Sequence, residues 1–121
     1  MTEEEVILTT VTDRNQLEQL AKQLGKEGYK VVSAATLQEL LIEIQKEGKI
    51  SLAVVDVAAF DEGVGKQLEE LHKTKIPFIV ISPQKGPSTQ NEILKHGASG
   101  LFSKGLRIRD LLEYIHTTLG K

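Results

Sequence analysis

The sequence predicts an α/β domain in which a parallel β-sheet is covered by helices on both faces. Five short apolar runs alternate along the chain with five stretches whose apolar residues recur at helical spacing. Neighbouring runs are separated by about the length of one βαβ unit, which is typical of doubly wound parallel sheets. The third run, residues 52–55 (LAVV), contains no polar residue, so we expect it to be a strand buried on both faces in the middle of the sheet.

The first part of the chain is predicted to hold two strands and two helices. Residues 6–11 (VILTTV) and 30–34 (KVVSA) are short and rich in β-branched side chains, as strands are. The helix between them has an apolar stripe and two glycines at its end: Leu17, Leu20, Ala21 and Leu24, then Gly25 and Gly28. Thr36 and Glu39 have the spacing of a capping box and predict where the second helix begins. Its buried face is expected to be Leu37, Leu40, Leu41 and Ile44.

The remainder of the chain continues the alternation. A third helix is predicted from Val64, Leu68 and Leu71, and a fourth strand from residues 76–82 (IPFIVIS). Ser88 can cap a short helix that ends before Gly97. Residues 100–103 then predict a fifth strand. A final amphipathic helix is predicted from Ile108, Leu111, Leu112, Ile115 and Leu119.

Composition limits the class of protein. A chain of 121 residues with 40% hydrophobic content can form one domain with a core but not two, so residues 1–121 are expected to be a single domain. A net charge of −2 provides no bulk attraction to nucleic acid or anionic membranes. The absence of cysteine excludes disulfides and thiolate metal sites. The acidic start MTEEEVILTT does not resemble a signal peptide, and no apolar stretch has membrane-spanning length. A cytoplasmic protein is therefore expected.

Polar residues close the third, fourth and fifth apolar runs. They are Asp56, Ser82 and Lys104, and a parallel sheet would bring all three to its carboxyl edge, where open α/β sheets bind ligands. Taken alone, Asp56 is most simply explained as a cap of the turn after its strand. However, a carboxylate can also act as a nucleophile and become an aspartyl phosphate, with a hydroxyl and an ammonium binding the phosphoryl oxygens. The convergence of the three residues favours this second interpretation.

These residues and the layout around them resemble the receiver domain of two-component response regulators, over residues 6–119. The resemblance implies a three-layer flavodoxin-like fold, with a five-stranded parallel sheet in the order 2-1-3-4-5 and five flanking helices. It implies a signalling role rather than metabolic catalysis. Asp56 matches the phosphoacceptor, Ser82 the hydroxyl that binds the phosphoryl group, and Lys104 the lysine that pairs with it. The segment 95–104 (KHGASGLFSK) is similar to the Gly-Ala turn that leads to this lysine in the family.

The chain departs from the family at the metal site. Receivers normally end the first strand with two adjacent acids that hold Mg²⁺, whereas a gapless count from Gly28 places Val11 and Thr12 there. Asp13 follows one residue later, so the expected metal ligands are Asp13 and Asp56, because Mg²⁺ is usually held by one or two carboxylates together with substrate oxygens. Without a metal, the negative charge at the site is poorly neutralised and phosphoryl transfer should slow severely.

The chain also departs from the family in the residues that report phosphorylation. The usual proline after the lysine is Gly105 here, and the aromatic residue expected three positions before the lysine is Leu101. Phe102 is adjacent, but it should point to the opposite face of the sheet. Phe60 stands where the family often has proline.

Three hypotheses about function remain open. The first is a receiver that takes a phosphoryl group on Asp56 from a histidine kinase or phosphotransfer protein and signals to an output domain or second receiver. The second is a pseudo-receiver that binds partners or dimerises without phosphorylation. In either case the family's interaction face, made by the fourth helix, fifth strand and fifth helix, would be basic here through Lys95, Lys104, Arg107 and Arg109. By analogy this suggests an acidic partner patch, with a homodimer as a further option, and a solvated helix surface explains the charges equally well. The third is a small-molecule-binding or hydrolytic domain, for which the chain has no cofactor loop or nucleophile-elbow pattern.

Overall fold

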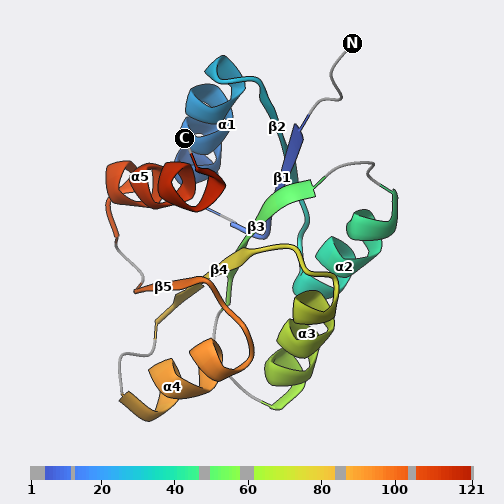
Figure 1. The fold of residues 1–121 in the computed structure, drawn as a ribbon. Helices are drawn as coiled ribbons and strands as arrows, with labels where there is room; N and C mark the ends of the chain where they lie inside the picture. The colour runs from blue at the N-terminus through green and yellow to red at the C-terminus, as the bar shows by residue number, and fades with distance from the viewer. Residues whose placement is uncertain are drawn as a thin grey trace.

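The protein folds as a single parallel sheet between two layers of helices (Figure 1). The computed structural model describes residues 5–11, 13–46, 50–57, 62–83, 87–103 and 106–120. The strands are β1 (Glu5–Thr9), β2 (Tyr29–Ser33), β3 (Ile50–Asp56), β4 (Phe78–Ser82) and β5 (Gly100–Ser103). The helices are α1 (Arg14–Lys26), α2 (Leu37–Lys46), α3 (Glu62–Lys73), α4 (Pro87–Lys95) and α5 (Ile108–Leu119). The strands are parallel and their order is β2-β1-β3-β4-β5, so the predicted fold class and strand order are confirmed.

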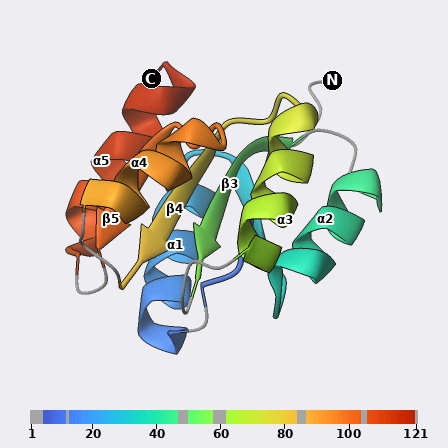
Figure 2. The same cartoon turned by 90° about the horizontal axis from the view of Figure 1, so that it is seen from below.

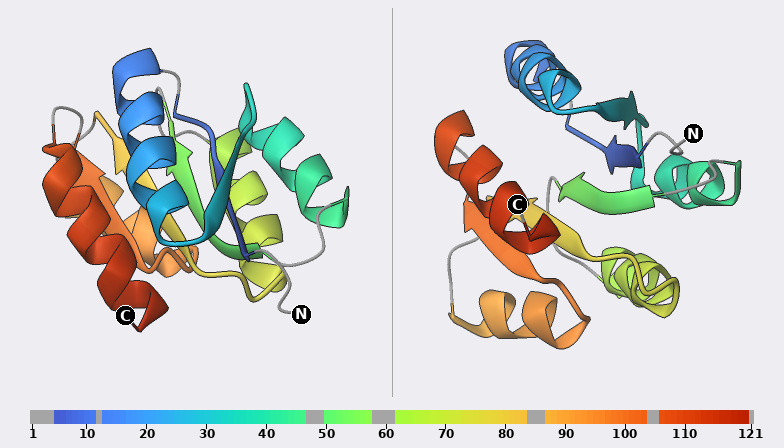
Figure 3. Two further views of the ribbon diagram at one scale, coloured as in Figure 1. Left: turned by 90° about the horizontal axis from the view of Figure 1, so that it is seen from above. Right: turned by 45° about the horizontal axis from the view of Figure 1, so that its top comes forward.

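The two faces of the sheet bury separate apolar clusters. Figures 2 and 3 show the helices that cover these faces. On the face covered by α2, α3 and α4, the cluster includes Ala53 and Val55 of β3. On the face covered by α1 and α5, it includes Leu52 and Val54 of the same strand. All four side chains have 0% exposure. The uninterrupted apolar run therefore forms a central strand whose successive residues fill opposite halves of the core, as predicted.

The helix ends follow from local hydrogen bonding. The predicted start of α2 is confirmed with one difference from a capping box. Thr36 Oγ1 accepts from Glu39 N at 3.1 Å, but the Glu39 carboxylate accepts from Ala35 N at 3.0 Å and not from the amide of Thr36. α1 runs through Gly25 to Lys26, one residue past the predicted break, and left-handed Gly28 (φ 93°) then turns the chain into β2.

Gly97 turns the chain after α4 in the same way, and the side chain of His72 lies close to it. Its φ is 103°, and a Cβ atom there would lie 2.3 Å from Nδ1 of His72. The glycine is needed both for the backbone conformation and for the approach of the imidazole ring. Within the described part of the chain, no helix has the length and apolar character needed to cross a membrane.

Candidate functional site

β3 and β4 lie side by side in the sheet (Figure 2), and two of the three predicted site residues are the last residues of these strands. Asp56 is the last residue of β3 and is half-buried, and Ser82 is the last residue of β4 and has 0% exposure. Asp56 lies opposite Ile81 in the register, so Ser82 is one position beyond it at the same edge. The amide of Val57 donates to the Ile81 carbonyl at 2.9 Å, which continues the pairing past the aspartate.

The third predicted residue, Lys104, lies outside the described residues. The register nevertheless shows where the chain enters that position, since Ser82 of β4 lies opposite Ser103, the last residue of β5. Ser103 is thus the last described residue before position 104.

At the end of β1, Thr10 makes the contact that the sequence did not predict. Its amide donates to the Val54 carbonyl at 3.0 Å, which places Thr10 opposite Val55. A regular parallel ladder would continue with a bond from the Asp56 amide to the carbonyl of Thr10. Instead, the Asp56 amide donates to the Thr10 hydroxyl at 2.7 Å, and this hydroxyl donates to the Asp56 carbonyl at 3.2 Å. β1 ends at Thr9, two residues before the predicted end, because a side chain replaces the main chain as the partner of β3.

The neighbours of Thr10 are also buried, and they are hydrogen-bonded to each other. Thr9 is fully buried, and its hydroxyl accepts from the amide of Val11 at 3.0 Å. Val11 itself is 3% exposed. The end of β1 therefore carries two buried hydroxyls, and Val11, one of the two positions matched to the family's acids, has an aliphatic side chain.

The predicted metal ligand Asp13 lies at the start of α1. It is the N-cap residue, is exposed, and its Oδ1 accepts from the amide of Gln16 at 3.0 Å. Thr12 lies outside the described residues. Among the residues that the structure describes, no three acidic or imidazole groups come together as a metal site. Since Mg²⁺ needs a shell of oxygen ligands and prefers carboxylates, this donor set does not fit a resident Mg²⁺ of the family's kind; the pairing of Asp13 with Asp56 on a metal stays a prediction.

The two residues before Ser103 point to opposite faces, as predicted. Leu101 packs on the cluster under α2, α3 and α4, whereas Phe102 packs on the cluster under α1 and α5. Phe102 meets Tyr114 of α5 edge to face, with ring centroids 5.4 Å apart. The Tyr114 hydroxyl donates to the Ser99 carbonyl, and its ring lies so close to Gly100 that a Cβ there would be 2.6 Å away. The aromatic contacts of β5 are thus made with α5, and positions 60 and 105 lie outside the described residues.

Three of the four residues of the predicted basic face can be located, on α4 and at the start of α5, whereas Lys104 lies outside the described residues. Lys95, Arg107 and Arg109 are exposed, and none of them forms an ion pair within the described ranges. Leu94, next to Lys95, is 48% exposed.

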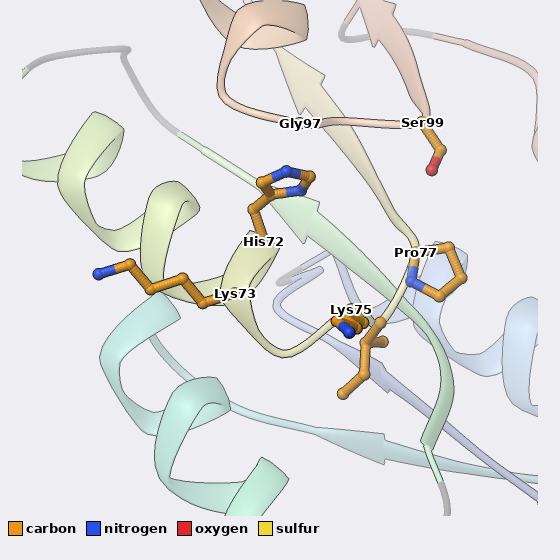
Figure 4. Close-up of a pocket in the computed structure, with 7 residues that line it drawn as sticks. His72, Lys73, Lys75, Pro77, Gly97 and Ser99 are labelled. Atoms are coloured by element: carbon orange, nitrogen blue, oxygen red, sulfur yellow. The ribbon is translucent and has the colours of Figure 1, made fainter.

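The pocket in Figure 4 lies at the other end of the sheet. Its lining comes from the segments that lead into β4 and β5, which are the amino ends of these strands, whereas Asp56 and Ser82 are at carboxyl ends. It is lined by His72, Lys73, Lys75, Ile76, Pro77, Gly97 and Ser99. The imidazole of His72 points toward Gly97, and Lys73 points away (Figure 4). Lys73 pairs with Glu70 at 3.2 Å. Lys73 is the last residue of α3 and Lys75 lies just after it, where positive charge offsets the helix dipole. The pocket is therefore separate from the site at the carboxyl ends of the strands.

Comparison with known proteins agrees with this geometry. A family model described as the response regulator receiver domain matches residues 9–116. A CheY-like response regulator receiver domain protein from Methanospirillum hungatei is 28% identical, with a TM-score of 0.78 over 98% of this chain and 95% of that one. A response regulator from Thermotoga maritima is 21% identical (TM-score 0.81, 98% and 100% covered). An orphan response regulator of H. pylori is 16% identical (TM-score 0.81, 95% and 96% covered). No curated protein sequence gives a significant match.

Proposed function

Since the chain belongs to the response regulator receiver domain family, we propose that it accepts a phosphoryl group on Asp56 and passes the change to a partner through α4, β5 and α5. The observation that supports this most is the placement of Asp56 and Ser82 at adjacent strand ends of one sheet edge. The domain would act as a signalling module and not as a metabolic enzyme.

The proposed reaction is a displacement at phosphorus. A carboxylate oxygen of Asp56 forms the new O–P bond, while the bond from phosphorus to the donor breaks and its electron pair leaves with the donor group, such as the imidazole nitrogen of a phosphohistidine. In the family's arrangement, the hydroxyl of Ser82 would donate to a phosphoryl oxygen. In the family's arrangement, the ammonium of Lys104 pairs with the same group. No carboxylate at the end of β1 assists, so we expect transfer to be slow compared with receivers that hold a metal.

The proposed partners are a histidine kinase or phosphotransfer protein as donor, and an output domain or second receiver as target. The basic residues Lys95, Arg107 and Arg109 suit an acidic patch on the target. A second copy of this chain could supply acids from the same face, because Glu92 of α4 and Asp110 of α5 are exposed. A homodimer of this kind should weaken when Arg107 and Arg109 are changed to Glu, measured by sedimentation velocity, and an Lys22→Glu change on exposed α1 is the control.

A second candidate function is supported by the end of β1. The bonds from Thr10 to Asp56 and the buried Val11 favour a receiver fold that binds partners whether or not Asp56 is phosphorylated. In this case Asp56→Asn would leave partner binding unchanged, and the arginine substitutions would still weaken it.

Intact-mass spectrometry after incubation with acetyl phosphate separates the two candidates. The phosphoacceptor hypothesis predicts that the wild-type protein gains the mass of one phosphoryl group and that Asp56→Asn gains none. If the wild-type protein gains no mass at any Mg²⁺ concentration over many hours, the phosphoacceptor hypothesis is wrong and the phosphorylation-independent function takes its place.

A further inference from the structure

We infer that Thr10 is a positioning residue for Asp56, because its hydroxyl ties the main chain of Asp56 to the end of β1, and that the residues around it do not fit a resident Mg²⁺. The structural part of this inference stands without the proposed phosphorylation. Only its last experiment, on the rate of phosphoryl uptake, rests on the proposed function.

The hydrogen bonds of Thr10 fix the main chain of Asp56 in both directions. The hydroxyl accepts from the Asp56 amide at 2.7 Å and donates to the Asp56 carbonyl at 3.2 Å. Thr10 is 3% exposed, so water cannot readily replace these bonds when the hydroxyl is removed. On the other side of the same strand, the Val57 amide is bonded to Ile81 of β4. The backbone that carries the Asp56 carboxylate is therefore tied to β1 by one side chain and to β4 by the sheet.

The same arrangement removes the groups that a metal would need. A hydroxyl that already accepts one bond and donates another is a poor substitute for a carboxylate ligand, and the adjacent Val11 is apolar and buried. The Asp13 carboxylate accepts a hydrogen bond from the amide of Gln16. A metal that bound this carboxylate would therefore compete with the cap of α1. Together these contacts leave few oxygen ligands available to a metal among the described residues at this edge.

Hydrogen exchange of the Asp56 amide tests the positioning role. Thr10→Val keeps the shape of the side chain but removes the acceptor, so exchange of this amide should become at least about tenfold faster. Thr10→Ser keeps the hydroxyl and should stay within about threefold of the wild-type rate. The amide of Ile79 in the middle of β4 serves as the internal reference. If Thr10→Val leaves the Asp56 amide as protected as in the wild-type protein, the hydroxyl is not its partner and the inference is overturned.

A Mg²⁺ titration of the wild-type protein tests the metal-free site and needs no variant. The amide resonances of Val11, Asp56 and Val57 should not move in a saturable way as MgCl₂ is raised through the millimolar range. A saturable shift of these resonances that is lost in Asp56→Asn would show a resident metal and overturn this part of the inference.

Phosphoryl uptake from acetyl phosphate then links Thr10 to the proposed function. Uptake should be slower in Thr10→Val than in the wild-type protein and should be restored in Thr10→Ser. Equal rates in all three proteins would show that Thr10 does not position the nucleophile. If the wild-type protein takes up no phosphoryl group, the proposed function has failed, while the exchange and Mg²⁺ experiments still decide the role of Thr10.

Discussion

The strand-end site has two halves that use the same sheet edge in different ways. In the β3–β4 half, Asp56 and Ser82 stand at the last strand positions and have the chemistry expected of a phosphoryl-accepting site. In the β1 half, the hydroxyls of Thr9 and Thr10 are buried and bonded to the protein's own main chain. The comparison teaches that the buried hydroxyls at the end of β1 serve the protein's own hydrogen bonding, whereas the end of β3 carries a half-buried carboxylate.

The difference arises from side-chain length and polarity. A threonine hydroxyl reaches no farther than a neighbouring strand, where it can replace a main-chain acceptor. An aspartate in the same position would carry its charge beyond the ladder toward a metal or water, because a buried, unpaired carboxylate is costly. The β1 half therefore gains local hydrogen bonds and loses the means to neutralise an incoming phosphoryl group.

The largest expected effect concerns Ser82 in the β3–β4 half. If its hydroxyl binds the transferred group, Ser82→Ala should slow phosphoryl uptake about 100-fold, which is typical for loss of one transition-state hydrogen-bond donor. Uptake is followed by intact mass over time. Ser103→Ala, on the paired residue of β5, is the matched control and should keep the wild-type rate. Unchanged uptake in Ser82→Ala would remove Ser82 from the site.

A carboxylate added at the end of β1 should enable this half of the site to bind Mg²⁺. Val11→Asp should lower the free energy of unfolding by about 3–5 kcal/mol in EDTA, because it leaves a charge uncompensated at a buried position. Mg²⁺ at about 100 times its Kd should then restore about 2.7 kcal/mol. Urea denaturation with and without Mg²⁺ measures both values. The account is contradicted if Mg²⁺ stabilises the wild-type protein to the same extent as the variant.

Loss of the Thr10 hydroxyl should have a smaller effect on stability. Thr10→Val leaves the Asp56 amide without its partner and should cost about 1–3 kcal/mol, whereas Thr10→Ser should cost less than this. The free energies come from urea denaturation of each protein. Thr117→Val removes a hydroxyl that bonds the Glu113 carbonyl on an exposed turn of α5, and this control should change stability by less than about 0.5 kcal/mol. A Thr10→Val protein as stable as the control would argue against a buried hydrogen bond.

The smallest expected effect concerns Asp13. Because Asp13 is the N-cap of α1, Asp13→Ala should lower the free energy of unfolding by about 1 kcal/mol. Asp13→Asn should lower it much less, because Asn also caps helices. Urea denaturation distinguishes these values. A metal ligand would behave differently, since Asn would then abolish a Mg²⁺ response that the wild-type protein showed.

The sequence was sufficient to predict the fold because each element is locally consistent. The apolar run 52–55 predicted a central strand, the spacing of Thr36 and Glu39 predicted the start of α2, and the polar residues after successive runs predicted where the site lies. The placement of Asp56 beside the end of β4 then followed from parallel topology alone.

The role of Thr10 could not be predicted in the same way, because it depends on the register between strands that lie more than 40 residues apart in sequence. A gapless count placed Val11 and Thr12 at the metal positions and gave no reason to examine the residue before them. The available signal was a pair of threonines closing the first strand. The packing of Tyr114 on Gly100 could not be predicted either, because it depends on how α5 packs against the sheet.

The most direct test of the two-half account compares phosphoryl uptake by the wild-type protein in MgCl₂ and in EDTA, with Asp56→Asn alongside and intact mass as the readout. The account predicts slow uptake of one phosphoryl group on Asp56, at rates that agree within about threefold in the two buffers because no metal shares the transition-state charge. Uptake that occurs in MgCl₂ and is absent in EDTA would contradict the metal-free site, and a wild-type protein that gains no mass in either buffer would contradict the assignment of Asp56 as phosphoacceptor.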